Sequence, residues 1–323
     1  MTNPSHYWAS QRLFFKYHNP PNRTAEMSST SKYTLPDGRN VDYKLSTPQT
    51  GGGDSAQLVL LSNSLTAPFP VWDHIAQALL EQGYGVLQYD QPGHGGSSAP
   101  SDLNSTTFES LADDVASLLS GLKIDKVNAW IGVSMGAATG VYFVVRHPGI
   151  VRNLVICDTI SSSPKVARVN DLFGPRADTA QKKGNMDSMV DATFDRWFSQ
   201  EWQKSHPQEV ERVRGIMSTT TVDGFVTCIR ALQSETFDLK PLVSKIGGVC
   251  DNAMLLVGEL DADLPKSMDE LRRRVEEGFQ SAGKASTVEL KVIKGAGHVS
   301  YVDGFDEFWT VVKQFLDHCN QRA

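Results

Sequence analysis

The stretch Gly-Val-Ser-Met-Gly at residues 132–136 decides how the rest of the chain is interpreted. It follows the apolar run Val127–Ile131, which predicts a strand buried on both faces. The mostly small residues that come after it, at 137–140, predict a helix that packs closely. A serine on such a tight strand-to-helix turn presents its hydroxyl, and small flanking residues let neighbouring backbones approach. We therefore predict that Ser134 is a catalytic nucleophile; the alternative is a serine that only caps the helix.

Apolar runs and helical spacing alternate on both sides of this stretch. The other runs typical of buried strands are Leu58–Leu61, Gly85–Tyr89, Val151–Cys157, Ala253–Val257 and Thr287–Val292. Apolar residues at helical intervals predict helices at Trp72–Gln82, Phe108–Leu122, Met135–His147, Lys266–Phe279 and Phe305–His318. This alternation predicts an α/β fold, with a mostly parallel central sheet flanked by helices. A hairpin is predicted before it at Tyr33–Leu45, because proline and glycine within residues 36–38 favour a turn.

Two segments break this rhythm. Residues 161–239 show helical spacing and no strand-like run, so we predict an all-helical lid inserted into a core formed by residues 32–160 and 240–323. Residues 1–31 are poor in acids and rich in aromatic side chains. They are predicted to form an N-terminal extension, a docking or disordered tail, with an organelle transit peptide as the alternative.

A serine nucleophile needs a base, and two histidines are candidates. His298 ends the stretch Gly-Ala-Gly-His at 295–298, just after the last predicted strand, and its small neighbours leave room for an imidazole to approach the serine. His94 lies in the tight turn at 91–96, where a histidine more often makes a local structural bond. We prefer His298 as the base.

The acid that orients the base is expected between the serine and the histidine along the chain. Asp261 lies just past the predicted strand Ala253–Val257. Its carboxylate would hold the imidazole tautomer and stabilise the imidazolium. The neighbours Glu259 and Asp263 are alternatives, and Asp158, directly after an earlier strand, is a separate one.

An oxyanion hole requires two backbone N–H donors. Met135, the residue after the nucleophile, is expected to supply one. The other is expected from the loop after Leu58–Leu61, where Leu65 is preferred over the adjacent Ser64.

Composition excludes several classes of protein. The chain has 323 residues, and its net charge of −6 (31 basic against 37 acidic side chains) comes without a basic run, which argues against nucleic-acid binding. No apolar stretch is long enough to cross a bilayer. The four cysteines are scattered, without metal-ligand or disulfide spacing. We therefore expect a cytoplasmic protein that binds no metal, and a hydrolytic triad that needs no cofactor.

Taken together, these motifs resemble the α/β-hydrolase superfamily and, more narrowly, the 3-oxoadipate enol-lactonase group. The stretches that carry the resemblance are Leu61–Leu65, Trp72, Tyr89–Gly95, Gly132–Gly136, Cys157–Thr159, Arg196–Phe198, Gly258–Asp261 and Gly297–His298. The resemblance implies that Ser134, Asp261 and His298 form a triad, and that the enzyme hydrolyses a small-molecule lactone or ester through an acyl-enzyme.

The resemblance also suggests which residues contact the substrate. Trp197 is implied to be a lid residue that faces the pocket. Arg196 is the cation that the lid offers to an acidic substrate, and Ser64 is the third residue expected to contact the substrate.

The chain departs from that group at three positions. The group usually has glycine where this chain has Thr66 and Ala137, and arginine where it has Pro92. We therefore expect a different lactone or ester as the substrate, in secondary metabolism. A carbon–carbon bond hydrolase or a cyclase with the same triad, and a ligand-binding receptor on this scaffold, are the alternative functions. The sequence leaves a homodimer open.

Overall fold

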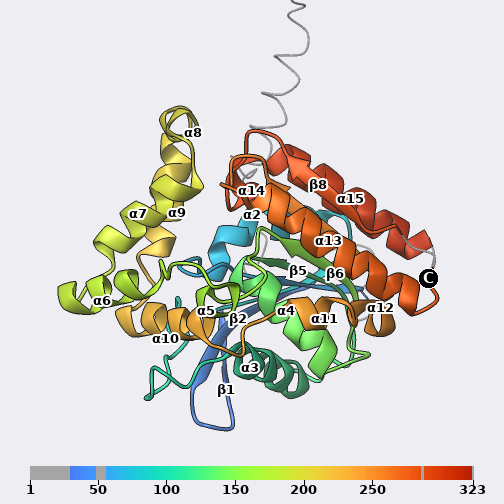
Figure 1. Ribbon diagram of the computed structural model, residues 1–323, viewed down its shortest axis with the longest axis horizontal. Helices are drawn as coiled ribbons and strands as arrows, with labels where there is room; N and C mark the ends of the chain where they lie inside the picture. The colour runs from blue at the N-terminus through green and yellow to red at the C-terminus, as the bar shows by residue number, and fades with distance from the viewer. Residues whose placement is uncertain (1–29, 49–55, 285–286, 322–323) are drawn as a thin grey trace, which may run out of the picture.

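A computed structural model describes residues 30–48, 56–284 and 287–321 (Figure 1). Within them lies one sheet of eight strands in the order β1-β2-β4-β3-β5-β6-β7-β8. The strands are β1 (Ser31–Thr34), β2 (Asn40–Ser46), β3 (Leu58–Ser62), β4 (Gly85–Tyr89), β5 (Val127–Val133), β6 (Val151–Cys157), β7 (Asn252–Gly258) and β8 (Glu289–Ile293). The pairs β1–β2 and β2–β4 are antiparallel, and the rest of the sheet is parallel. The prediction of a mostly parallel sheet is confirmed. Most of the N-terminal extension, residues 1–29, lies outside the described residues.

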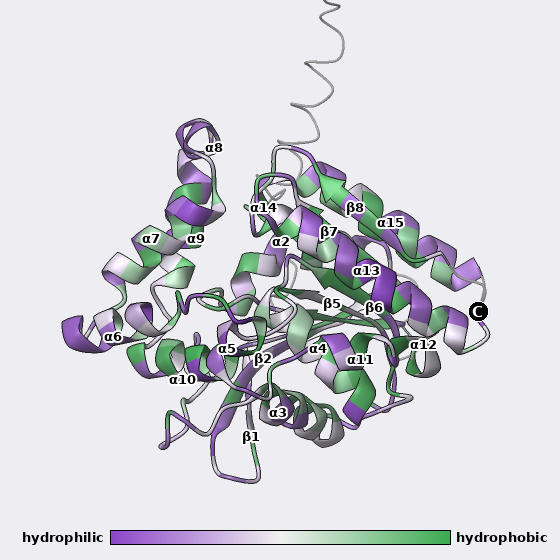
Figure 2. Ribbon diagram, in the orientation of Figure 1, coloured by the Kyte–Doolittle hydropathy of each residue, from purple (hydrophilic) through white to green (hydrophobic). Residues whose placement is uncertain are grey.

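Helices pack on both faces of this sheet, because its central strands are apolar along their whole length. Every residue of β5 is buried, and all but one of β6. One group of helices consists of α3 (Phe108–Gly121), α4 (Met135–Arg146), α11 (Lys240–Val243), α12 (Ile246–Val249) and α13 (Leu264–Ser281). The other consists of α2 (Asp73–Glu81) and α15 (Phe305–Gln321), with the short η2 (Phe69–Trp72) and α14 (Ser300–Asp303) beside them. Figure 2 shows the hydrophobic strands inside and hydrophilic positions on the outer faces of α13 and α15.

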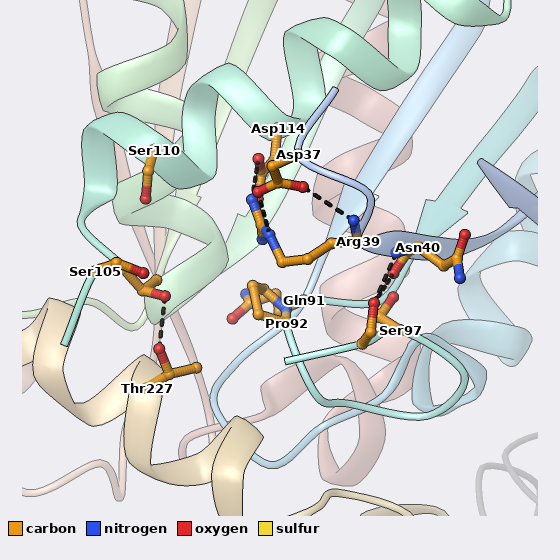
Figure 3. Close-up of polar contacts among 12 residues, drawn as sticks. Asp37, Arg39, Asn40, Gln91, Pro92, Ser97, Ser105, Ser110, Asp114 and Thr227 are labelled. Atoms are coloured by element: carbon orange, nitrogen blue, oxygen red, sulfur yellow. Dashed lines mark hydrogen bonds and ion pairs between the residues drawn. The ribbon is translucent and has the colours of Figure 1, made fainter. Parts of the chain in front are cut away.

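The predicted hairpin is confirmed as β1 and β2, which pair antiparallel across a turn in which Gly38 has a φ of +89°. Arg39 anchors this turn. Its guanidinium donates two hydrogen bonds of 2.8 Å to Asp114 on α3 and one of 2.7 Å to Asp37 (Figure 3). The cavity beside this ion pair encloses about 10 Å³, room for at most about one water molecule, so it is no substrate pocket.

Between β6 and β7 the chain forms a long helical segment, residues 161–239. Its helices are α5 (Pro164–Ala167), α6 (Gly174–Lys183), α7 (Asp187–Trp197), α8 (Gln200–Ser205), α9 (Pro207–Met217) and α10 (Val222–Gln233). Its two ends meet, since Ser162 and Asp238 form an isolated antiparallel bridge and the Leu239 N–H donates to Ser161 O at 2.8 Å. Figure 1 shows α6 to α9 standing to one side of the sheet.

The regularly spaced aromatic residues of this segment are divided between two helices. Phe194 and Trp197 lie on α7, whereas Trp202 lies on α8. The break comes after Phe198, which has extended backbone, and Ser199 begins the next helix because its Oγ accepts the Trp202 N–H at 3.2 Å. A capping serine thus ends one helix and begins the next, although the helical spacing of apolar residues continues across the break.

Two glycines provide a matched test of the close packing at the start of α4. A Cβ on Gly136 would lie 2.3 Å from the Ser62 carbonyl oxygen, whereas a Cβ on Gly215, in α9, would meet no atom within 4 Å. We expect Gly136→Ala to lower the free energy of unfolding by about 2 kcal/mol or more. Gly215→Ala is expected to raise it by about 0.5–1 kcal/mol, because alanine favours a helix. Denaturant unfolding of both variants measures this; equal effects would contradict the close approach.

Candidate active site

Ser134 occupies a strained turn between β5 and α4. Its φ of 56° and ψ of −115° are unusual for a residue with a side chain, and its N–H is held by Cys157 O at 2.8 Å. Within residues 127–144 every residue is buried except Ser134, which is partly exposed. The turn therefore presents one hydroxyl at the carboxyl edge of the sheet.

His298 and Asp261 meet at that same edge. They follow β8 and β7, and His298 Nδ1 lies 2.7 Å from Asp261 Oδ2, with both side chains buried. A carboxylate that accepts the Nδ1–H leaves the Nε2 lone pair free to take a proton. Nε2 lies 3.4 Å from Ser64 Oγ, on the loop after β3. In the described part of the chain Ser134 Oγ has no hydrogen-bond partner, so the serine–histidine bond is not made here, and such bonds often tighten only with substrate.

The electrostatics of this pair suit a neutral base beside an ionised acid. Burial lowers the pKa of His298, Asp261 opposes this, and the positive charges of Arg196 and Arg176 lower it further. Burial alone would raise the pKa of Asp261, but the charge of His298 and its hydrogen bond bring it below its ordinary value. At neutral pH the imidazole is therefore uncharged.

The predicted oxyanion donors also lie here. Gly136 packs against the backbone of Ser62 and Asn63, which brings the start of α4 to the loop that carries Leu65. Neither the Leu65 N–H nor the Met135 N–H has an acceptor among the described residues. Two unpaired donors beside a nucleophile are the arrangement that stabilises an oxyanion.

The turn at 91–96 holds this loop in place. The Thr66 N–H donates to His94 Nε2 at 2.9 Å, and Gln91 Nε2 donates to Asn63 O at 2.6 Å. Thr66 has a left-handed φ of 66°, and its own Oγ1 donates to Leu65 O. These bonds explain how a threonine is accommodated in a conformation that glycine adopts more easily.

The alternatives to His298 and Asp261 have other partners. His94 donates from Nδ1 to Pro92 O at 3.0 Å, and burial lowers its pKa to about 4. Glu259 accepts the Gly295 N–H at 2.9 Å, and Asp263 stands at the start of α13. Neither of these carboxylates bonds His298. Asp158 hydrogen-bonds Asp261 and does not reach the imidazole.

Trp197 covers the His298 side chain. Its indole is buried and stacks on the His298 imidazole, with ring centroids 5.4 Å apart and 26° between the planes. A Cβ on Gly297 would lie 1.9 Å from the Trp197 carbonyl oxygen, so the end of α7 touches the loop that carries His298 directly. Trp197 therefore packs directly on the imidazole.

Two guanidinium groups lie near the imidazole. Arg196 is on α7, and Arg176, on α6, donates to Thr193 Oγ1 at 2.6 Å and lies 5.6 Å from the Phe225 ring. Burial, helped by the charge of Arg196, lowers the pKa of Arg176 to about 10. Among the described residues no carboxylate forms an ion pair with either guanidinium. Sequence reasoning missed Arg176, because an arginine inside a helical segment carries no local signal of where its side chain lies.

Other kinds of site find little support in the described ranges. No group of three or more His, Cys, Asp or Glu side chains there could hold a metal ion. None of the helices there is long and apolar enough to span a bilayer. The four cysteines are buried, and none of them forms a disulfide bond within these ranges.

The buried His94 makes a pH-dependent contribution to stability that can be measured. Its folded pKa of about 4 lies below the ordinary 6.5, so the unfolded chain binds more protons between these values. This histidine should therefore lower the free energy of unfolding by up to about 3 kcal/mol as pH falls from about 6.5 to about 4. In His94→Gln, whose amide oxygen can still accept the Thr66 N–H, that loss should disappear. Urea unfolding at several pH values tests this, and parallel curves for the two proteins would contradict it.

Comparisons with known proteins agree with the fold and the motifs. The family model described as the alpha/beta hydrolase fold matches residues 57–222. The 3-oxoadipate enol-lactonase 1 of Acinetobacter baylyi is 27% identical over 226 residues, which cover 69% of this chain and 78% of that protein. The enol-lactonase structure from Burkholderia xenovorans aligns with a TM-score of 0.74 at 27% identity, over 89% of this chain and all of that one.

A thermophilic esterase from Thermogutta terrifontis shares the fold, with a TM-score of 0.73 at 20% identity over 90% of this chain and 99% of its own. The resemblance read from the motifs, to the superfamily and to the enol-lactonase group, is confirmed. With more than half of its length matched by the family model, the chain belongs to the α/β-hydrolase fold family.

Proposed function

We propose that this protein is a serine hydrolase that cleaves a small-molecule lactone or carboxylic ester through an acyl-enzyme on Ser134. One observation carries the proposal: the buried Asp261–His298 hydrogen bond of 2.7 Å stands at the sheet edge where the strained turn exposes the Ser134 hydroxyl. The similarity to enol-lactonases of Acinetobacter baylyi and Burkholderia xenovorans supports ester-bond hydrolysis as the reaction.

The residues divide the reaction into two steps. Ser134 Oγ attacks the carbonyl carbon as His298 Nε2 takes its proton, and the oxygen that becomes negative accepts from the Leu65 and Met135 N–H groups. The carbon–oxygen bond to the leaving alkoxide then breaks, and His298 returns the proton to that oxygen. In the second step a water molecule, deprotonated by His298, releases the acid and restores Ser134.

We propose that the helical segment at 161–239 serves as a lid over this site. Trp197 supports this role, because its contact with His298 couples the segment to the base. Arg176 and Arg196 would offer positive charge to a substrate that carries an anionic group, since neither forms an ion pair with a carboxylate of the described chain, although Arg196 interacts at longer range with Asp261. Ser64, at 3.4 Å from His298 Nε2, would border the scissile group.

Ser134→Ala tests the reaction type. We expect it to lower kcat by about 10⁴-fold or more, as removal of a triad nucleophile does. Turnover is measured on p-nitrophenyl acetate, an aliphatic enol-lactone, an aromatic macrolactone and a β-diketone, with a fluorophosphonate probe to label the active serine. Ser267→Ala, a change of the same kind on α13, is the control and should keep wild-type turnover. A Ser134→Ala protein that turns over like the wild type would end the proposal, and serine-dependent cleavage of the β-diketone alone would move it to carbon–carbon chemistry.

Arg176→Gln tests whether the site prefers anionic substrates. A charge-assisted hydrogen bond contributes about 1.5–3 kcal/mol, so KM for a carboxylate-bearing ester should rise by about 10-fold. KM for the neutral methyl ester of the same compound should stay constant, and Arg196→Gln should behave alike. Arg273→Gln, which changes an exposed arginine on α13, is the control. Equal changes of KM for the charged and the neutral ester would show that the arginines only support the fold.

A further inference from the structure

Asp158 is a fully buried carboxyl group that the catalytic steps above do not use. It follows β6 directly, with a left-handed φ of 44°, and its N–H donates to Leu256 O at 3.0 Å. A left-handed conformation at a residue other than glycine costs on the order of 1 kcal/mol and persists where the surroundings enforce it. The conformation turns the Asp158 carboxyl into the space between β7 and the loop of the base.

Its two oxygens join the loops that carry the acid and the base. Oδ1 accepts the Gly258 N–H at 2.7 Å, three residues before Asp261. Oδ2 accepts the Ser300 hydroxyl at 3.4 Å, two residues after His298. Asp158 therefore lies behind the acid–base pair and contacts both loops.

The Asp158 carboxyl is also hydrogen-bonded to the carboxyl of Asp261. Two carboxylates cannot form a hydrogen bond unless one of them carries a proton. Asp261 is the ionised partner, because it faces the His298 Nδ1–H and the positive charge of Arg196. The surroundings therefore favour the proton on Asp158, which is fully buried and whose pKa is raised far above its ordinary value by burial and then by the charge of Asp261.

Among the described residues no cation forms an ion pair with Asp158. The strongest electrostatic interactions of Asp158 with charged groups are those with Asp261 and Asp303, and it also interacts with Cys157 and Tyr301. The pKa values of the Cys157 thiol and the Tyr301 hydroxyl are raised by burial, so both stay neutral. Burial raises the pKa of Asp303 to about 7, and its Oδ2 is held by the Gly297 N–H at 2.7 Å.

We propose that Asp158 is a positioning residue for the reaction: as a neutral carboxylic acid it donates a hydrogen bond to Asp261 and fixes the carboxylate that orients His298. The inference rests on the proposed function, because it assigns Asp261 the role of the triad acid. Asp158 must be neutral in order to donate this hydrogen bond to the Asp261 carboxylate. A second negative charge there would raise the pKa of His298 and keep the base protonated at neutral pH.

The substitution Asp158→Asn separates this role from a purely structural one. An asparagine side chain can donate to Asp261 and accept the Gly258 N–H, so it reproduces the neutral acid. We expect the pKa of the His298 imidazole, followed by NMR titration of the full-length protein, to match the wild type. The acid limb of kcat/KM against pH should match as well. Asp158→Ala, which removes the donor, should lower kcat by about 10-fold with little change in KM, the effect of losing one hydrogen bond to a charged group.

Three results would overturn the proposal. A His298 pKa that falls by about one unit in Asp158→Asn would show that the wild-type residue is ionised, since a negative charge would have been removed. Wild-type kcat in Asp158→Ala would show that Asp261 does not need the donor. An Asp158→Asn protein as impaired as Asp158→Ala would show that the amide does not replace the acid. Asp42→Asn, the same exchange at a buried carboxyl on β2, is the control and should leave the His298 pKa unchanged.

The NMR titration needs no substrate, so the two proposals can fail separately. If Ser134→Ala keeps full turnover while the Asp158 variants behave as expected in the titration, the proposed function fails and the proton on Asp158 stands. If Ser134→Ala abolishes turnover while the His298 pKa shifts in Asp158→Asn, the proposed function stands and the assignment of the proton to Asp158 fails.

Discussion

The close backbone contact around the Ser134 turn is the constraint on which the rest of the site depends. A strand can pass into a helix at this angle only if the chain has no side chain at 132 and 136, where a Cβ would lie 2.4 and 2.3 Å from backbone oxygens. The cost is a serine with a positive φ, and the surrounding sheet enforces it through the bond from its N–H to Cys157 O. The same contact brings the start of α4 to the loop after β3. One steric requirement thus places both the Ser134 hydroxyl and the two N–H groups that would stabilise an oxyanion.

Buried charge is the second organising force. Around His298 the protein gathers the carboxyl groups Asp158, Asp261 and Asp303, and two guanidinium groups approach from the helical segment. In a medium of low dielectric constant such charges act strongly, and a carboxyl without a positive partner keeps its proton. As a result the three groups differ in protonation state: Asp261 is ionised, Asp158 is protonated and the imidazole is neutral. Each state follows from which groups face each side chain.

The differences from the enol-lactonase pattern have local structural explanations. Thr66 takes the left-handed conformation that suits glycine, held by its bonds to His94 and Leu65. Pro92 accepts a hydrogen bond from His94 through its carbonyl oxygen, a contact that needs no particular side chain. Neither change disturbs the backbone that presents Leu65.

The amino-acid sequence by itself determined the parallel sheet, the turn at Ser134 and the candidate acid and base. These depend on local signals: apolar runs for strands, glycines for the tight turn, and a histidine and an aspartate just after strands whose carboxyl ends meet at one edge. Tertiary structure decided what depends on groups far apart in the chain. His94 is a buried histidine with a lowered pKa, and it accepts a hydrogen bond from the Thr66 N–H. Arg176 lies near His298 because α6 packs beside α7. The proton on Asp158 likewise depends on burial and on the charge of Asp261, 103 residues further along the chain, so a carboxyl's ionisation follows from its three-dimensional neighbours and not from its position in the sequence.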